Sequence, residues 1–186
     1  MRIISGFLKG KRINYLKNFT TRPLKDSVKE NIFNIIKHSS LVERKIEKSN
    51  VLDLYSGIGS FGIECISRGA EKVTFVEKDN LAFNTLKKNL IKLSIIKKSN
   101  LINQKIENAL NNHINEKYHI FFFDPPFTDE NFIENLKIIK QKRLFEINHI
   151  IIIHREKKKI DEFNDVVKII NIKEYGRSKI IFGLFC

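Results

Sequence analysis

The sequence predicts an α/β, Rossmann-like fold in which a mostly parallel sheet is covered by helices on both faces. Apolar runs of strand length alternate with segments whose apolar residues recur at helical spacing, most regularly between residues 51 and 139. Strands and helices in alternation form parallel sheets with right-handed crossovers. Asp53, Glu77 and Asp124 stand at or near the ends of three such runs. Ligands bind at the carboxyl ends of strands in these sheets, so we expect the functional site there.

Length and composition suit one domain, residues 1–186, with a polyanionic partner. The chain contains 34 Lys and Arg against 21 Asp and Glu, and the net charge of +13 favours nucleic acid. A general compositional bias toward Lys would explain part of this excess. No apolar run reaches the roughly 18 residues that a membrane span needs. Cys65 and Cys186 indicate neither a disulfide framework nor a zinc site, so we expect a cytoplasmic protein.

Residues 1–21 are predicted to form a basic N-terminal arm or hairpin. Arg2, Lys9, Lys11 and Arg12 stand among apolar residues, with glycines at positions 6 and 10. Such a segment would contact phosphates and position a nucleic acid without reading its sequence. A solvated, frayed terminus is the alternative.

The next segment is predicted to be a helix. Ser27 and Glu30 have the spacing of a capping box, and four apolar residues then share one helical face: Val28, Ile32, Ile35 and Ile36. Arg22 lies just before this helix, free for a phosphate or for a cofactor pocket.

The loop at residues 57–62 has the pattern of a nucleotide-binding turn between a buried strand and a helix that opens near Ser60. Gly57, Gly59 and Gly62 match the spacing of the dinucleotide fingerprint, and Glu77 has the position of the acid that binds a ribose. Asp53 lies inside the first strand, which suits a cationic, amino-acid-bearing ligand better than a nicotinamide dinucleotide. We therefore predict S-adenosylmethionine as the cofactor. The alternative is that Asp53 only caps a turn.

The rest of the chain continues the alternation. Strands are predicted at residues 72–77, 100–103, 119–123 and 150–153, and helices at 61–68, 106–114 and 132–139, with a further helix after Asp79, its predicted cap. Residues 166–175 and 179–186 read as two strands joined by a short turn. The charge run at 155–159 is predicted to be a solvated loop. None of the five histidines has a spacing that indicates metal or triad chemistry, and we expect an ordinary role for each.

Asp124-Pro125-Pro126-Phe127 follows the strand at 119–123 and forms a second informative motif. Two prolines fix φ and remove two backbone donors, so this loop is rigid and presents carbonyl oxygens. The Asp124 carboxylate and the Pro125 carbonyl would orient an exocyclic amine, and Phe127 would stack on its base. A proline-rich turn without function would not require Asp and Phe at its flanks.

With these motifs the chain resembles the RsmD-type methyltransferases, which act on the exocyclic N2 amine of a guanine in 16S small-subunit ribosomal RNA. The matching positions span most of the chain: Met1-Arg2-Ile3-Ile4 and Gly6; Arg22-Pro23, Asp26, Val28, Glu30, Phe33 and Asn34; Leu52-Asp53, Ser56-Gly57 and Gly59; Gly62-Ile63-Glu64 and Ser67-Arg68; Glu77 and Asp79; and Asp124-Pro125-Pro126-Phe127. The resemblance implies a class I methyltransferase fold, with a seven-stranded sheet that ends in an antiparallel pair, and S-adenosylmethionine as methyl donor.

The residues expected at the cofactor are Asp53, Ser56, Gly57, Gly59, Gly62, Glu77, Lys78 and Ile106. Those expected at RNA are Arg2, Lys9, Lys11, Arg12, Arg22, Arg177 and Lys179. Two segments depart from the family pattern. Lys105-Ile106 replaces a small or acidic pair near the adenine, where the Ile106 backbone N–H or Glu107 would serve instead. Ile153-His154-Arg155 replaces an acidic strand ending, and RNA contact is one role open to Arg155.

We therefore expect direct methyl transfer to an unpaired or flipped guanine, with no metal and no covalent enzyme intermediate. The expected partner is 16S ribosomal RNA within a ribonucleoprotein or an assembled 30S particle, bound by a monomer. A DNA adenine-N6 methyltransferase would normally need an added target-recognition segment. A non-enzymatic RNA-binding protein on this fold would be expected to have lost Asp53 or Asp124. A nicotinamide-dependent oxidoreductase has no evident use for the Asp-Pro-Pro-Phe motif.

Overall fold

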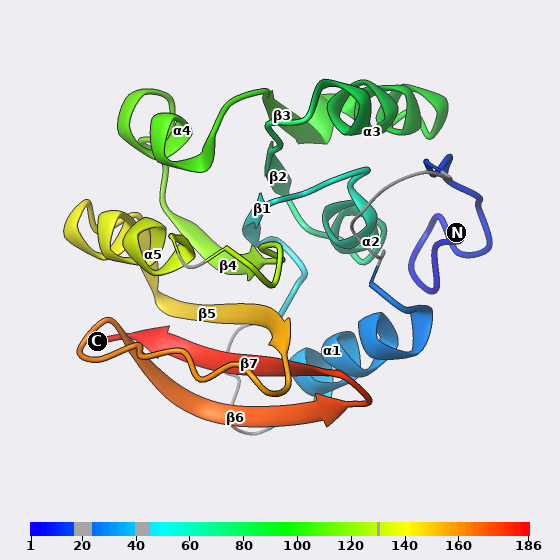
Figure 1. Ribbon diagram of the computed structural model, residues 1–186. Coiled ribbons are helices and arrows are strands. Elements are labelled where there is room, and N and C mark those ends of the chain that lie inside the picture. Colours follow the sequence, from blue (N-terminus) through cyan, green and yellow to red (C-terminus); the bar gives the residue numbers. More distant parts are fainter. Residues whose placement is uncertain (17–23, 40–44, 130) are drawn as a thin grey trace.

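The computed structural model describes residues 1–16, 24–39, 45–129 and 131–186, and the structural statements below concern these ranges. A seven-stranded sheet runs through the molecule in the order β3-β2-β1-β4-β5-β7-β6 (Figure 1). The strands are β1 Asn50–Leu54, β2 Lys72–Val76, β3 Ser99–Ile102, β4 Tyr118–Phe123, β5 Phe145–Glu156, β6 Val167–Tyr175 and β7 Ser178–Phe185. The helices are α1 Asp26–His38, α2 Ser60–Ser67, α3 Asn80–Lys92, α4 Ile106–Asn112 and α5 Phe132–Gln141, with a short 3₁₀ turn at Ile96–Lys98.

The pairing confirms the predicted sheet. β1 is parallel to β2 and β4, β2 to β3, and β4 to β5, whereas β7 is antiparallel to both β5 and β6. The parallel strands carry nearly continuous apolar runs because helices cover both of their faces. All parallel strands therefore end at one edge of the sheet, and the loops after β1, β2 and β4 meet there.

Two hydrophobic cores lie on opposite faces of the sheet. Helices α1, α2 and α3 cover one face, and α4 and α5 cover the other (Figure 1). Successive side chains of β4 point alternately into the two cores. Phe122 stacks on Phe61 of α2 with ring centroids 3.9 Å apart, whereas Phe121 and Phe123 belong to the core under α4 and α5. This two-sided burial fixes the strand register, because a shift by one residue would exchange the two faces.

Two predictions about local structure were wrong. Helix α1 begins at Asp26 with Lys25 as its N-cap residue and no side-chain capping bond, so Ser27 lies inside the first turn and the capping box does not form. The predicted solvated loop at 155–159 begins too early, since β5 extends to Glu156 and Arg155 is fully buried. Burial of Arg155 is possible because Asp161 neutralises its charge. By contrast, the predicted cap of α3 is confirmed, as Asp79 accepts a hydrogen bond from the Ala82 N–H at 2.8 Å.

Residues 1–16 form an irregular hairpin docked on α2, referred to below as the arm. Arg2 and Arg12 pair in antiparallel fashion, and Glu64 of α2 accepts hydrogen bonds from the backbone N–H groups of Ile4 and Ser5, both at 2.9 Å. The arm thus packs against the helix that follows the glycine loop (Figure 1). Among the described residues, no helix is both long and apolar enough to cross a bilayer.

Candidate active site at the carboxyl edge of the sheet

The glycine loop leaves β1 and enters α2 at the carboxyl edge of the sheet. Ser56 ties the loop to β2, donating through its N–H and its hydroxyl to the Val76 carbonyl at 3.1 and 3.3 Å. Gly57 has a φ of +55°, and a Cβ added there would meet no atom within 4 Å. A ligand can therefore lie directly against the backbone at Gly57.

The other two glycines of the loop have packing reasons to lack a side chain. Gly59, at φ +85°, is the N-cap residue of α2, and a Cβ there would lie 2.3 Å from Leu86 of α3. A Cβ on Gly62 would lie 2.2 Å from the Phe75 ring. Their identity is therefore explained by the close approach of α2 to α3 and β2, whereas only Gly57 of the three faces open space.

Asp53 projects from β1 beneath this loop and is almost completely buried. Its Oδ2 accepts a hydrogen bond from the Gly62 N–H at 2.9 Å, which caps the first turn of α2. Its Oδ1 is buried and has no hydrogen-bond partner among the described residues. Burial raises the pKa of Asp53 well above its ordinary value of 3.8, and the nearby Asp124 and Glu77 carboxylates raise it further. An unpartnered buried carboxylate oxygen is costly and fits a ligand that donates to it.

Glu77, just after β2, organises the backbone around the site. Its Oε2 accepts from the Gly57 N–H at 2.8 Å and its Oε1 from the Asp79 N–H at 2.7 Å. Each oxygen retains a further lone pair for a hydroxyl donor. Lys78 is exposed beside it, and Ile106 is the first residue of α4, with its side chain in the core under α4 and α5.

Asp124 is half-buried directly after β4, and its N–H donates to the Leu54 carbonyl at 3.4 Å. Its Oδ1 lies 2.8 Å from Nδ1 of His154, near the end of β5, and the Phe127 ring meets the same imidazole edge-on at 5.7 Å. Every histidine was expected from the sequence to have an ordinary role, and His154 was not expected beside Asp124. The register explains the contact, because Phe123 pairs with Ile153 and the next residue of each strand follows at the same edge.

Arg155 holds the Asp-Pro-Pro-Phe loop from the other face of β5. Its guanidinium donates to the Pro126 carbonyl at 3.2 Å and to Asp161 at 2.9 Å, and it lies over the Phe132 ring of α5 at 4.4 Å. The RNA contact that the sequence left open for Arg155 is incompatible with this burial. The ion pair between Arg155 and Asp161 could not be recognised from the sequence, because Asp161 is one of several charged residues that follow Arg155 in the chain.

Comparison with known proteins identifies the family to which this chain belongs. The model of a family described as "conserved hypothetical protein 95" matches residues 1–183. The ribosomal RNA small subunit methyltransferase D of Haemophilus influenzae is 34% identical over 161 residues, which cover 86% of this chain and 80% of that protein. The chain belongs to the RsmD family.

Solved structures agree with membership of the RsmD family. A crystal structure of a candidate methylase from Haemophilus influenzae has a TM-score of 0.77 at 30% identity and covers 98% of this chain and 96% of that one. A candidate methyltransferase from Escherichia coli has a TM-score of 0.83 at 22% identity, with coverage of 98% and 96%, and so shares the fold. The class I methyltransferase architecture expected from the sequence is thereby confirmed.

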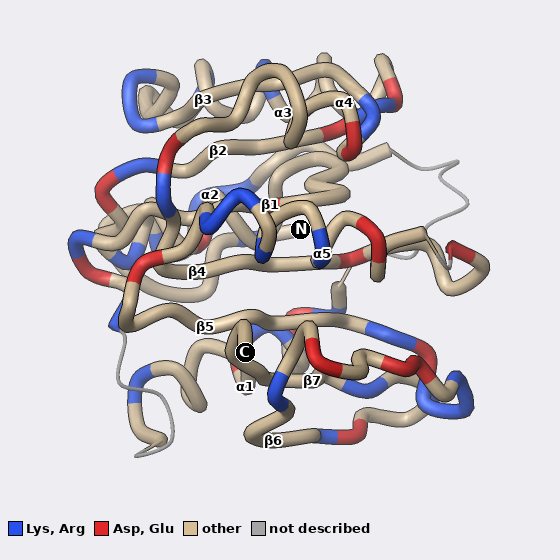
Figure 2. Tube along the Cα trace, turned by 90° about the vertical axis from the view of Figure 1, so that its left-hand side faces the viewer, with Lys and Arg blue, Asp and Glu red and all other residues tan. Residues whose placement is uncertain are grey.

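The residues expected at RNA do not gather on one element of this RsmD-family chain. Arg2, Lys9, Lys11 and Arg12 are exposed on the arm. Over the molecule as a whole, Lys and Arg are scattered along helices, strands and loops (Figure 2). Arg177 is exposed in the β6–β7 turn. Two residues expected at RNA remain. Arg22 lies outside the described residues. Lys179 is half-buried, and its ammonium group donates to the Lys159 carbonyl.

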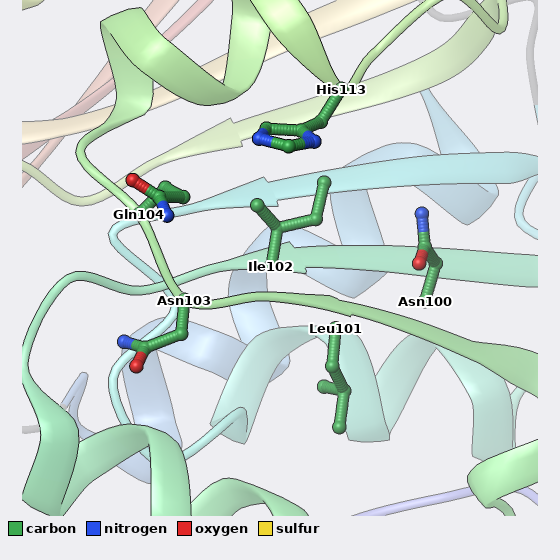
Figure 3. Close-up of a pocket in the computed structure, with 6 residues that line it drawn as sticks. All are labelled: Asn100, Leu101, Ile102, Asn103, Gln104 and His113. Atoms are coloured by element: carbon green, nitrogen blue, oxygen red, sulfur yellow. The ribbon is translucent and has the colours of Figure 1, made fainter.

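An open pocket of about 350 Å³ lies beside the site, at the edge strand β3 (Figure 3). The lining residues are Asn100, Leu101, Ile102, Asn103, Gln104 and His113. The side chains of Leu101 and Asn103 project to the opposite side of the strand from that of Ile102 (Figure 3). Asn103 donates to the Glu77 carbonyl at 2.8 Å. None of the three carboxylates of the site lines this pocket. Within the described ranges, no three His, Cys, Asp or Glu side chains are arranged to hold a metal ion.

Proposed function

We propose that this chain transfers a methyl group from S-adenosylmethionine to the exocyclic N2 amine of a guanine in 16S ribosomal RNA. The observation that carries the proposal is the half-buried Asp124 carboxylate, fixed at the carboxyl edge of the sheet beside the buried Asp53. An edge with two acids and a carbonyl-presenting loop suits a cationic donor and an amine acceptor. Membership of the RsmD family and the names of its relatives support ribosomal RNA as the substrate.

S-adenosylmethionine fits the residues at the glycine loop. The free Oδ1 of Asp53 would accept a hydrogen bond from the ligand's amino group, and the open backbone at Gly57 leaves room for the methionine portion. The remaining lone pairs of Glu77 would accept from the ribose hydroxyls. Ser56, Gly59 and Gly62 would shape this loop, with Lys78 and the Ile106 N–H toward the adenosine. When bound, the cofactor supplies an electrophilic methyl group on sulfur.

Asp124, Pro125, Pro126 and Phe127 would hold the target base. Asp124 Oδ2 and the Pro125 carbonyl accept hydrogen bonds from the two amine hydrogens, which aligns the nitrogen lone pair with the methyl group. As the N–C bond forms, positive charge develops on the amine, and the adjacent carboxylate stabilises it. The Phe127 face stacks on the base, worth about 1–3 kcal/mol at single-stranded sites. The substrate guanine must therefore be unpaired or flipped.

The arm and helix α3 would provide the RNA surface. Neither residues 1–16 nor the segment Asn80–Lys92 contains an Asp or Glu, and Lys92 of α3 donates to the Arg12 carbonyl at 3.3 Å. Phe7 and Tyr15 of the arm are 65% and 52% exposed, which leaves their rings available to unpaired bases. We expect this surface to engage 16S RNA in a ribonucleoprotein or 30S particle, with the enzyme a cytoplasmic monomer.

The test is methyl transfer from labelled S-adenosylmethionine to small ribosomal subunits from cells that lack the protein, with naked RNA and DNA alongside. We expect label in a guanine N2 amine of 16S RNA with the wild type and loss of that label with Asp124→Ala. Label in adenine N6 of DNA would favour the DNA methyltransferase instead. Cofactor binding without transfer to any nucleic acid, or no cofactor binding at all, would refute the proposed reaction.

A further inference from the structure

His154 contacts the one carboxylate that faces the proposed amine site. Its Nδ1 lies 2.8 Å from Oδ1 of Asp124. An ionised carboxylate only accepts hydrogen bonds, so His154 must carry its proton on Nδ1 and donate it. Oδ1 is thereby occupied, and Oδ2 is the oxygen left for the substrate.

The imidazole is held on several sides, so it can fix the direction in which Asp124 points. Its side chain is only 11% exposed, against 27% for Asp124. His154 lies in β5 opposite Ile180 of β7, and the Phe127 ring packs edge-on against it. Asp124 and Phe127 belong to the same loop, so this loop contacts the imidazole at two points.

The next residue of β5 fixes the same loop from the opposite face of the sheet. Arg155 donates to the Pro126 carbonyl and is itself held by Asp161, through contacts of its Nε and Nη2 groups. Consecutive strand residues point to opposite faces, so His154 and Arg155 grip the loop at two points, at Asp124 and at Pro126. The loop is therefore contacted at both of these residues.

We propose that His154 is a positioning residue for methyl transfer, acting through Asp124. It directs Oδ2 toward the target amine and leaves Oδ1 unavailable to the substrate. This inference rests on the proposed function. It assigns a role to a residue that does not itself touch the substrate, at a position where the chain departs from the family pattern.

Atoms and charges balance in the proposed step. The amine lone pair forms the N–C bond to the methyl group while the C–S bond breaks, and its electron pair stays on sulfur, which becomes neutral. The amine, now cationic, loses one proton to Oδ2 of Asp124. The carboxyl group releases that proton to water when the product leaves. His154 keeps its Nδ1 proton throughout, so its effect is on orientation.

The experiment compares His154→Leu with His154→Asn in the full-length enzyme, using 30S subunits that lack the methyl group. Leucine cannot donate, whereas the asparagine amide can replace the Nδ1–H. We expect kcat to fall on the order of 100-fold for His154→Leu and to return to within about 10-fold of wild type for His154→Asn. The KM for S-adenosylmethionine should stay within about 2-fold in both, because the side-chain contacts of His154 are with Asp124 and the Phe127 ring.

His149→Leu is the matched control. His149 is also a mostly buried histidine of β5, and it accepts a hydrogen bond from the Phe185 N–H at 2.8 Å. Its loss should lower the unfolding temperature and leave kcat unchanged. An equal kcat defect in His149→Leu, or no rescue by His154→Asn, would mean that His154 acts only through stability and would overturn the inference.

A second readout does not depend on activity. The ¹⁵N shifts of the His154 ring, assigned by their loss in His154→Asn, should show a protonated Nδ1 in the wild type. An unprotonated Nδ1 would overturn the proposed donation to Asp124. Absence of methyl transfer by the wild type would instead refute the proposed function, so the two failures are distinguishable.

Discussion

Two buried carboxylates at opposite ends of the glycine-loop region, Glu64 and Asp53, are partnered very differently. Glu64 is fully buried in α2, and its two oxygens accept from two backbone N–H groups of the arm and from the Arg68 guanidinium at 2.9 Å, with the Lys29 ammonium 3.7 Å away. Asp53 is as deeply buried but has a hydrogen bond on only one oxygen.

The difference separates a structural acid from one available to a ligand. The hydrogen bonds and ion pairs of Glu64 join the arm to α2 and α1. Asp53 keeps one oxygen without a partner among the described residues, at a place where burial and two neighbouring acids raise its pKa. Sequence motifs do not distinguish these two acids, since both match the family pattern, whereas their hydrogen bonds do.

The largest effect should come from Glu64→Ala. Without Glu64 the Lys29 ammonium would remain buried with only the half-exposed Asp26 carboxylate, 3.7 Å away, as its counter-charge. We expect the free energy of unfolding to fall by about 3–5 kcal/mol, measured by urea denaturation. Burial already lowers the pKa of Lys29. The double variant Glu64→Ala/Lys29→Met should therefore recover part of the loss, and a double variant no more stable than Glu64→Ala would contradict this account.

Asp53→Asn should reverse the pattern, because it should weaken cofactor binding without destabilising the fold. The asparagine carbonyl can still cap α2 by accepting from the Gly62 N–H, but it cannot offer a charged oxygen to the ligand's amino group. A lost charge-assisted hydrogen bond is worth about 1.5–3 kcal/mol, so cofactor affinity measured by calorimetry should fall on the order of 10- to 100-fold. A fall in unfolding free energy as large as that of Glu64→Ala would assign Asp53 to the structural class instead.

The pH dependence of the unfolding free energy should reveal the burial of Asp53. Because the pKa of Asp53 is raised in the folded state, the folded protein binds a proton that the unfolded chain has released. Unfolding free energy therefore decreases as the pH rises from about 3.8 toward the raised pKa. Asp53→Asn should lack this decrease. Urea denaturation of both proteins across this pH range checks it, and parallel curves would contradict it.

The smallest effect on stability should come from the charges of the arm. The Glu64 hydrogen bonds involve the arm's backbone, whereas Lys9, Lys11 and Arg12 are exposed. Replacement of these three residues by Gln should leave unfolding unchanged. RNA affinity should fall, and the slope of log K against log salt should become shallower by about 0.7 for each phosphate that the variant no longer neutralises. An unchanged slope would exclude the arm from the RNA surface.

Much of the fold could be predicted because each strand is an apolar run with clear limits. The limits of β2, β3 and β4 lie within a residue of the predicted ones. The burial of Arg155 could not be predicted, since a charge run normally indicates solvent and its neutralisation depends on Asp161 and the Phe132 ring. Asp124 was evident from its motif, whereas His154 was not, because their contact arises from the register of β4 and β5.

The spacing of the glycines in the loop also could not show which of them face a ligand. The pattern at residues 57–62 suggests three ligand-facing glycines, but only Gly57 faces open space. Gly59 and Gly62 lack a side chain because Leu86 and the Phe75 ring lie against them. A sequence pattern records where a side chain is absent and not which neighbour requires its absence.

The docking of the arm also has a consequence for the order of folding. Ile4, Ser5 and Leu8 are synthesised early, yet their hydrogen-bond partners Glu64 and Ser67 lie 59 to 60 residues later in the chain, and Asn14 pairs with Asn89, 75 residues away. During translation the arm therefore has no docking surface until α2 and α3 have left the ribosomal exit tunnel. Until then the arm is undocked and exposed to proteases and chaperones, although it is made before the residues that hold it.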